Sequence, residues 1–143
     1  MGGALVELVI RPYRPDDEDA VVALWRRCDL LVPGNDPHRD IALKTGFQPA
    51  LLLVGAVDGV LVASVMAGYE GHRGWINYLA VSPDFRRCGI GRRMMERAEV
   101  ELRGLGCPKI NLQVRGSNRA ATAFYERLGF VVEDRVSMGK RLI

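Results

Sequence analysis

Two apolar runs joined by an Asp-Gly pair constrain the fold of this chain more than any other feature. Residues 50–71 read ALLLVGAVDGVLVASVMAGYEG, with Asp58 and Gly59 between the two runs. An Asp-Gly pair between β-forming runs is a strong hairpin signal, because a tight hairpin turn needs positive φ values. A third run, RGWINYLAV at 73–81, follows after a short connection. The sequence therefore predicts three consecutive antiparallel strands in the middle of a sheet.

Two helices are predicted before the hairpin. Residues 14–29 begin with acidic side chains, which favour a helix N-terminus, and Asp16 is the expected N-cap. The apolar residues of this helix that share one face are Ala20, Val21, Leu24, Trp25 and Cys28. Residues 35–46 predict a second, short helix that is capped by Asp36, begins with Pro37 and stops at Gly46.

Alternating elements are predicted in the rest of the chain. Residues 4–11 are expected to form a strand, as are 109–114, 130–136 and 138–143. Helical spacing of Met94, Ala98, Leu102 and Leu105 predicts a helix that ends at Gly104 or Gly106. A last helix over 117–129 is capped by Ser117 or Asn118. The order β-α-α-β-β-β-α-β-α-β-β predicts one α/β domain over 1–143, with a mixed, mostly antiparallel sheet flanked by about four helices.

The composition narrows the class of protein. A formal net charge of +3 over 143 residues is below what a dedicated nucleic-acid binder displays. No apolar run approaches the length of a membrane span, and the N-terminus lacks the basic region of a signal peptide. Cys28, Cys88 and Cys107 show neither CxxC spacing nor a nearby histidine cluster. We therefore expect a cytoplasmic protein without a bound metal, a nucleic-acid partner or a membrane partner.

The stretch RRCGIGRR, residues 86–93, places two glycines between two pairs of arginines. It lies between a predicted strand and a predicted helix, where unpaired N–H groups and the helix dipole favour an anion. Gly89 and Gly91 leave room for a pyrophosphate, and the four arginines (Arg86, Arg87, Arg92 and Arg93) add positive charge. The GxxxxGK[ST] and GxGxxG patterns are both excluded by the residues after Gly91. By itself the stretch fits a phosphate site and a solvent-exposed basic turn about equally well.

Three motifs together resemble the GNAT superfamily of acyl-CoA-dependent N-acetyltransferases. The pyrophosphate loop of that family, [Q/R]-x-x-G-x-[G/A], corresponds to residues 86–91. LAVSPDFR before it and VRGSNRAATAFYERLGF after it are similar to the cofactor strand and the C-terminal segment of the family. The likeness spans nearly the whole chain, is greatest to a small bacterial YpeA-like branch, and implies a GNAT-like fold.

The resemblance implies roles for residues of each motif. The Leu79 N–H would stabilise the oxyanion that forms on the thioester carbonyl, and Tyr125 would act as general acid toward the departing thiolate. Asn118 would contact the cofactor arm, as well as capping a helix. The residues implied in acetyl-CoA binding are Leu79, Ala80, Val81, Arg86, Arg87, Cys88, Gly89, Ile90, Gly91, Arg92, Asn118 and Tyr125.

The general base departs from the family pattern. Gln113 stands where related protein-N-terminal acetyltransferases often have a glutamate, and an amide cannot accept the proton. Glu70 is the candidate base, with His72 beside it, and the alternative is that both belong to a polar turn. A water chain, or an acceptor amine with a low pKa, would remove the need for a base residue.

The acceptor side is poorly specified by the sequence. The family likeness assigns residues 28–40 to the substrate cleft, where Asp29, Asn35 and Asp36 could attract a cationic amine, although helix capping explains Asp36 equally well. The implied reaction is direct transfer of an acetyl group from acetyl-CoA to a primary amine, on a small molecule or a protein. The alternative is a non-catalytic acyl-CoA-binding or regulatory module. The apolar C-terminal strand could pair with a second copy to form a homodimer.

Overall fold

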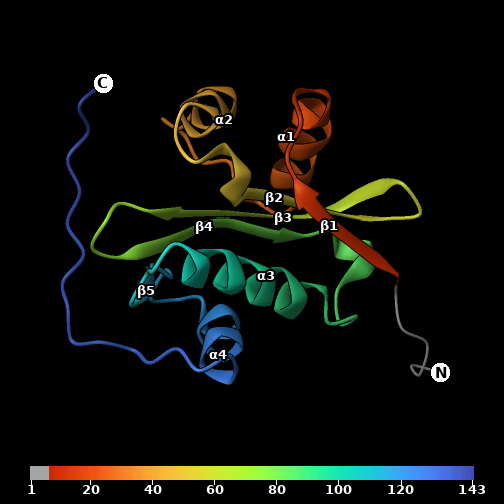
Figure 1. The fold of residues 1–143 in the computed structure, drawn as a ribbon. Helices are drawn as coiled ribbons and strands as arrows, with labels where there is room; N and C mark the ends of the chain where they lie inside the picture. Colours follow the sequence, from red (N-terminus) through yellow and green to blue (C-terminus); the bar gives the residue numbers. More distant parts are fainter. Residues whose placement is uncertain (1–6) are drawn as a thin grey trace. The chain divides into compact units, whose positions relative to one another are not determined.

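A five-stranded sheet organises the first part of the structure, a computed structural model that describes residues 7–143. The chain forms two units, the first ending at Leu112 and the second running from Gln113 to Ile143. The sheet lies in the first unit, with strands in the order β1-β2-β3-β4-β5 (Figure 1). The strands are β1 (Leu8–Pro12), β2 (Leu52–Val57), β3 (Val60–Tyr69), β4 (Gly74–Val81) and β5 (Ile110–Leu112). Neighbours from β1 to β4 are antiparallel, whereas β4 and β5 are parallel.

The predicted hairpin and the mixed α/β fold class are confirmed. Asp58 and Gly59 have φ values of 51° and 78°, and Val57 pairs with Val60 across the turn. Two positive φ values in a two-residue loop match the right-handed twist of the strands on either side. Positions 4–6 of the first predicted strand lie outside the described residues.

Helices cover both faces of the sheet. α1 (Glu18–Arg27) and α2 (Pro37–Thr45) lie on one face, and α3 (Ile90–Gly104) lies on the other (Figure 1). The buried residues of α1 are Val21, Val22, Leu24 and Trp25. Ala20 is exposed and Cys28 is only partly buried, so the predicted face was partly wrong. Val22 takes the place of Ala20, because burying the larger apolar side chain removes more apolar surface from water.

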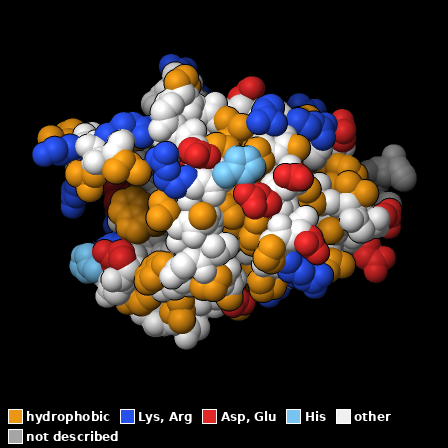
Figure 2. All heavy atoms as spheres, turned by 90° about the horizontal axis from the view of Figure 1, so that it is seen from above, with side chains coloured by type: hydrophobic (Ala, Val, Ile, Leu, Met, Phe, Trp, Pro, Cys, Tyr) orange, Lys and Arg blue, Asp and Glu red, His pale blue; other side chains and the backbone are white. Residues whose placement is uncertain are grey.

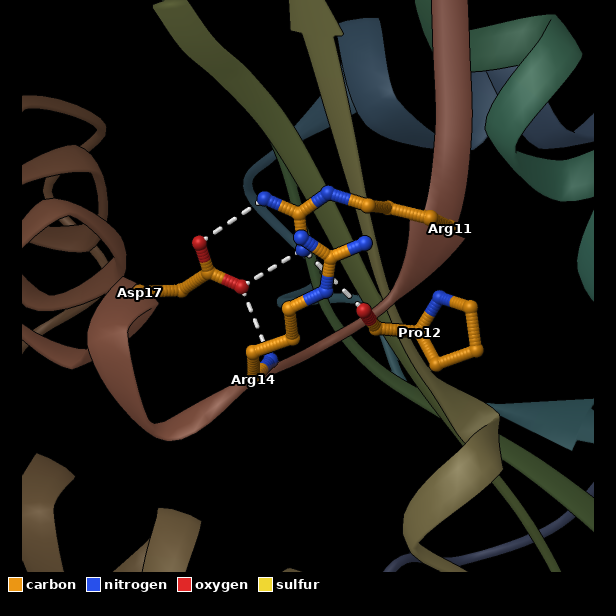
Figure 3. Close-up of polar contacts among 4 residues, drawn as sticks. All are labelled: Arg11, Pro12, Arg14 and Asp17. Atoms are coloured by element: carbon orange, nitrogen blue, oxygen red, sulfur yellow. Dashed lines mark hydrogen bonds and ion pairs between the residues drawn. The ribbon is translucent and has the colours of Figure 1, made fainter.

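The N-cap residue of α1 is Asp17 rather than the predicted Asp16, and its carboxylate bonds to residues before the helix. Pro15 begins a short 3-10 turn that ends at Asp17, which delays the α-helix to Glu18. The Asp17 carboxylate accepts the Arg14 N–H at 2.8 Å and two guanidinium N–H groups of Arg11 at 2.7 and 2.9 Å (Figure 3). The hydrogen bond from Arg11 is the main cause that lowers the pKa of Asp17.

The ends of α2 and α3 follow local sequence signals. Asp36 caps α2 by accepting the N–H groups of His38 at 3.0 Å and Arg39 at 3.3 Å, as predicted. α3 ends with Gly104, after which Gly106 adopts a φ of 82°. Its buried residues are Ile90, Met94, Met95, Ala98 and Leu102. The predicted Leu105 is 50% exposed, because it lies beyond the last turn of the helix.

The second unit contains α4 (Arg119–Arg127). Asn118, rather than Ser117, caps this helix by accepting the Ala121 N–H at 3.1 Å. The strands predicted over 130–136 and 138–143 do not form; in the described chain, no strand follows β5. Their apolar side chains are exposed, as Val136 at 86% and Ile143 at 85% show. Apolar patterning predicts a strand only where a neighbouring strand completes its backbone hydrogen bonds.

Candidate functional site

The edge of β4 that faces β5 is only partly paired. The two strands pair over three positions, from Gly74 opposite Ile110 to Ile76 opposite Leu112. Beyond Ile76, no strand of the described residues pairs with this edge of β4. The predicted site residues Leu79, Ala80 and Val81 lie on this stretch. An unpaired strand edge offers backbone N–H and C=O groups to a ligand.

A bulge interrupts β4 within the same stretch. The pairing between β3 and β4 shifts between Ser64 and Met66 of β3. Two residues of β4, Tyr78 and Leu79, therefore lie opposite one residue of β3. Tyr78 has a φ of 52°, which is rare for an aromatic residue in a strand.

The bulge decides which edge of β4 the Leu79 N–H faces. The Gly74 N–H donates to the Lys109 carbonyl beside β5 at 2.8 Å, and the Ser82 N–H donates to Val62 of β3 at 2.7 Å. In a regular strand, N–H groups whose residue numbers differ by an even number face the same edge. Gly74 and Ser82 differ by eight but face opposite edges, because the bulge between them reverses the alternation. Because Leu79 lies three residues before Ser82, its N–H faces away from β3, toward the partly paired edge.

The predicted anion loop leads into a helix without a side-chain cap. Gly89 is the N-cap residue of α3, with a φ of 76°, and a Cβ at this position would meet no atom within 4 Å. The first intrahelical bond runs from the Arg93 N–H to the Gly89 carbonyl at 3.2 Å. The N–H groups of residues 90–92 therefore have no partner within the helix. The buried Ile90 side chain anchors the end of the loop that leads into α3. Cys88, two residues earlier, is exposed.

The four arginines of the loop differ in what they contact. Among residues 7–143, the exposed Arg86 and Arg87 form no ion pair. Arg92 lies 3.7 Å from a glutamate one turn along α3. Arg93 donates to the Leu8 carbonyl at 3.3 Å and so contributes to holding β1. Arg86 and Arg87 thus have their positive charge available to an anion.

Asn118, the N-cap residue of α4, and Tyr125, within that helix, both belong to the second unit. The Tyr125 ring meets the rings of Phe124 and Phe130 edge-on, with centroids 5.1 and 5.6 Å apart. Burial raises the pKa of Tyr125 to about 12. The phenol therefore stays protonated at neutral pH, where it can donate a hydrogen bond. The first unit brings together the β4 edge and the arginine–glycine loop.

The Glu70 carboxylate takes part in a turn between β3 and β4. It accepts the backbone N–H groups of His72 and Arg73. These hydrogen bonds, the one from Arg73 first, lower the pKa of Glu70. Stabilising the ionised form makes a carboxylate a weaker base. Gln113, the residue at the position of the family glutamate, donates to the Ser137 hydroxyl within the second unit.

The face covered by α1 and α2 carries several acidic groups. Figure 2 looks down on this face and shows acidic side chains around a histidine. Within this part of the chain, His38 of α2 contacts Glu18 of α1 with an Nδ1–Oε2 distance of 2.6 Å, and this hydrogen bond raises the pKa of His38. Of the predicted acceptor residues, Asp36 is used in the helix cap, whereas Asp29 is exposed just after α1.

Sequence reasoning missed the residues around the bulge. The Tyr78 hydroxyl donates to Asp40 of α2 at 2.6 Å, and the Ser64 hydroxyl donates to the Tyr78 carbonyl at 2.8 Å. One signal was present: Ser64 is a polar residue in the middle of an apolar run, and it is fully buried. A buried hydroxyl needs a hydrogen-bond partner, but the sequence does not say which one.

Neither a cluster of metal-ligating side chains nor a membrane-spanning helix occurs in residues 7–143. No group of three or more His, Cys, Asp or Glu side chains in this range is arranged to hold a metal ion. No helix there has the length and apolar character needed to cross a membrane.

Known proteins share the sequence and fold of this chain. An acetyltransferase of Pectobacterium atrosepticum is 51% identical over 134 residues, which are 94% of this chain and 95% of that protein. The ribosomal-protein-S18-alanine N-acetyltransferase of Escherichia coli superposes with a TM-score of 0.72 at 25% identity, over 85% of this chain and 76% of that one. The aminoglycoside N-acetyltransferase AAC(6')-Iy, in complex with a CoA bisubstrate analogue, shares the fold (TM-score 0.75, 17% identity, 96% and 99% of the two chains).

The family assignment rests on sequence over most of the chain. The sequence profile described as "Acetyltransferase (GNAT) family" matches residues 8–130, which include every strand and helix of the structure. This chain therefore belongs to the acetyltransferase (GNAT) family and is an acyltransferase.

Proposed function

We propose that this protein transfers an acetyl group from acetyl-CoA to a primary amine, which attacks the thioester directly in a ternary complex. The observation that carries the proposal is the partly paired edge of β4, which leads through the arginine–glycine loop to the uncapped N-terminus of α3. A strand edge can bind the amide-containing pantetheine arm, and the helix N-terminus can bind the pyrophosphate. The CoA complex of a protein with the same fold supports this choice of donor.

The donor would be held mainly by backbone groups. Residues 87–92 would give their N–H groups to the pyrophosphate, and Arg86 and Arg87 would add charge beside it. Leu79, Ala80 and Val81 would lie along the pantetheine arm. Asn118 would contact that arm through the part of its amide that does not cap α4.

The chemistry requires little from side chains. The amine nitrogen bonds to the thioester carbon, and negative charge develops on the carbonyl oxygen. The Leu79 N–H, which faces the partly paired edge, would stabilise that charge. The C–S bond then breaks, and Tyr125 would give its proton to the sulfur and recover one from solvent. The attacking amine would lose its proton to water, because Glu70 is engaged in its turn.

The acceptor is proposed only as a class, a primary amine on a small molecule or a protein. The two named structural neighbours act on very different amines: an alanine of a ribosomal protein and an aminoglycoside. Asp29, which is exposed just after α1, would favour a cationic acceptor, since opposite charge speeds encounter. A single domain over 1–143, a homodimer and a cytoplasmic location stay predictions.

Mass spectrometry of the products tests the proposal. The protein would be incubated with acetyl-CoA and a panel of amines: a peptide with a free N-terminal alanine, a lysine peptide, a polyamine and an aminoglycoside. The proposal predicts one free CoA for each acetylated acceptor, and no acetylated protein intermediate after quenching. Tight binding of acetyl-CoA without acetylation of any amine would contradict it, and would favour the non-catalytic acyl-CoA-binding module.

A further inference from the structure

Tyr78 combines a strand position with a strained backbone. Four other non-glycine residues of the described chain have a positive φ (Asp29, Gln48, Asp58 and Arg87), and all four lie in turns or connections. Tyr78 instead lies within β4. An aromatic residue in this conformation is strained by about 1–3 kcal/mol and persists only where its surroundings hold it.

Three side chains hold Tyr78, one each from α1, β3 and α2. The rings of Trp25 and Tyr78 stack with their centroids 3.7 Å apart and their planes 8° from parallel. The Ser64 hydroxyl donates to the Tyr78 carbonyl at 2.8 Å and accepts from the Trp25 indole N–H at 2.9 Å. The Tyr78 hydroxyl donates to Asp40 Oδ2 at 2.6 Å. Ring, carbonyl and hydroxyl of Tyr78 are therefore each fixed by a separate partner.

The network is buried where it contacts the backbone. Trp25 and Ser64 are both 0% exposed, so their hydrogen bonds do not compete with water. Removing one partner would leave a buried polar group without its hydrogen bond, which is costly. The contacts therefore depend on one another. The bulge is thus built into the core under α1 and α2.

We infer that Trp25, Ser64 and Asp40 are positioning residues that keep Tyr78 in the left-handed conformation, so that the Leu79 N–H faces the partly paired edge. The inference rests on the proposed function, in which that N–H stabilises the oxyanion. If Tyr78 relaxed to ordinary extended backbone, the bulge would be lost or displaced. The regular alternation would then turn the Leu79 N–H toward β3. In this role the three residues act through the backbone of Tyr78.

Steady-state kinetics separate a positioning role from a role in folding. Asp40→Ala removes the acceptor of the Tyr78 hydroxyl, and kcat should fall about 10–100-fold, less than for complete loss of an oxyanion donor. The Kd of acetyl-CoA should change less than about twofold, because most donor contacts lie elsewhere. Asp40→Asn keeps an oxygen acceptor and should restore most of kcat. A lower Tm with an unchanged kcat per folded molecule would overturn the inference.

An NMR measurement on the free protein tests the backbone part. Tyr78-Leu79 is the single Tyr-Leu pair in the sequence, so ¹³C-carbonyl tyrosine with ¹⁵N leucine gives one HNCO signal. Its carbonyl is the one bonded by Ser64, and its amide is that of Leu79. Ser64→Ala and Asp40→Ala should both shift this signal, whereas Asp40→Asn should leave it near the wild-type position.

The two readouts distinguish failure of the inference from failure of the proposed function. A signal that stays unmoved in Ser64→Ala and Asp40→Ala would overturn the inference, whatever the activity. A moved signal with unchanged kcat would also overturn it, because the Leu79 N–H would then not matter for the reaction. Absence of acetyl transfer by the wild-type protein would count against the proposed function, while the NMR signal would still test whether the network holds the bulge.

Discussion

The backbone N–H groups of Gly74 and Ser82 donate to opposite sides of β4, to Lys109 beside β5 and to Val62 of β3. The direction in which the N–H groups point is thus reversed along β4. This reversal is the structural basis of the proposed site, because it turns the Leu79 N–H toward an edge where no described strand pairs with it. The loop that follows ends at a helix N-terminus with free N–H groups. Backbone geometry, more than side-chain chemistry, therefore defines the proposed donor site.

Substituting the N-cap glycine of α3 should weaken donor binding. Gly89→Ala adds a methyl group in open space, next to the N–H groups proposed to hold the pyrophosphate. We expect the Kd of acetyl-CoA, measured by isothermal titration calorimetry, to rise about tenfold or more, since one or more hydrogen bonds to a charged group are affected.

Gly59→Ala is a matched control for that variant. Gly59 has a φ of 78°, close to the 76° of Gly89, and a Cβ there also meets nothing within 4 Å. Both variants should lose a similar amount of stability, about 1–2 kcal/mol, from the left-handed backbone. Equal acetyl-CoA affinities for the two variants would count against the loop as the pyrophosphate site.

Replacing the carboxylate at the start of α1 should destabilise the protein in a pH-dependent way. Asp17→Asn removes the two-pronged bond to Arg11, and the free energy of unfolding at pH 7 should fall by about 1–3 kcal/mol. The pKa of Asp17 is lowered in the folded protein, so its contribution is present above the unfolded value of about 3.9. This stabilising contribution is lost as the pH falls through the pKa that Asp17 has in the folded protein.

Urea unfolding of wild type and Asp17→Asn at several pH values checks this sign. The difference between the two proteins should be largest near neutral pH and should shrink below about pH 4. Asp16→Asn, at the exposed neighbouring position, is the control and should change stability by less than about 0.5 kcal/mol. A gap between wild type and Asp17→Asn that is constant down to acidic pH would contradict the assigned ion pair.

Local signals in the sequence predicted much of the fold. The Asp58-Gly59 turn, the Asp36 cap and the Asn118 cap each depend on residues close together in the chain, and all three formed. The Asp16 cap was wrong because a 3-10 turn begun by Pro15 shifts the helix start. Neighbouring residues decide such features, so a sequence pattern can reveal them.

Features that depend on distant partners could not be predicted in this way. The conformation of Tyr78 depends on side chains from three other elements, none of which is signalled by the residues beside it. The strands predicted after residue 129 failed for the same reason, since a strand is completed by its neighbour. The candidate site residues were predicted from family motifs, whereas the bulge beside Leu79 is visible only in the structure.

Removing the Tyr125 hydroxyl should slow the chemical step without affecting donor binding. For Tyr125→Phe we expect kcat to fall about 10–100-fold, at the lower end of general-acid effects because a thiolate is a moderate leaving group. With a pKa of about 12, Tyr125 should cause no fall in rate below about pH 10. Phe130→Leu, which alters the same aromatic cluster, should retain most of kcat in the CoA-release assay.

Glu70→Gln should have little effect on the reaction. Its carboxylate is bonded to the N–H groups of His72 and Arg73, and an amide oxygen can still accept one of these. We expect kcat/KM to change less than about threefold, with the acidic limb of its pH profile unmoved. A loss of about 100-fold or more, together with loss of that limb, would identify Glu70 as the general base.

A crystal structure with acetyl-CoA bound tests the central claim most directly. The account predicts that the pyrophosphate oxygens accept hydrogen bonds from the N–H groups of residues 87–92. It also predicts that the thioester carbonyl oxygen lies within about 3 Å of the Leu79 nitrogen. Acetyl-CoA bound elsewhere, or a thioester carbonyl directed away from β4, would contradict it.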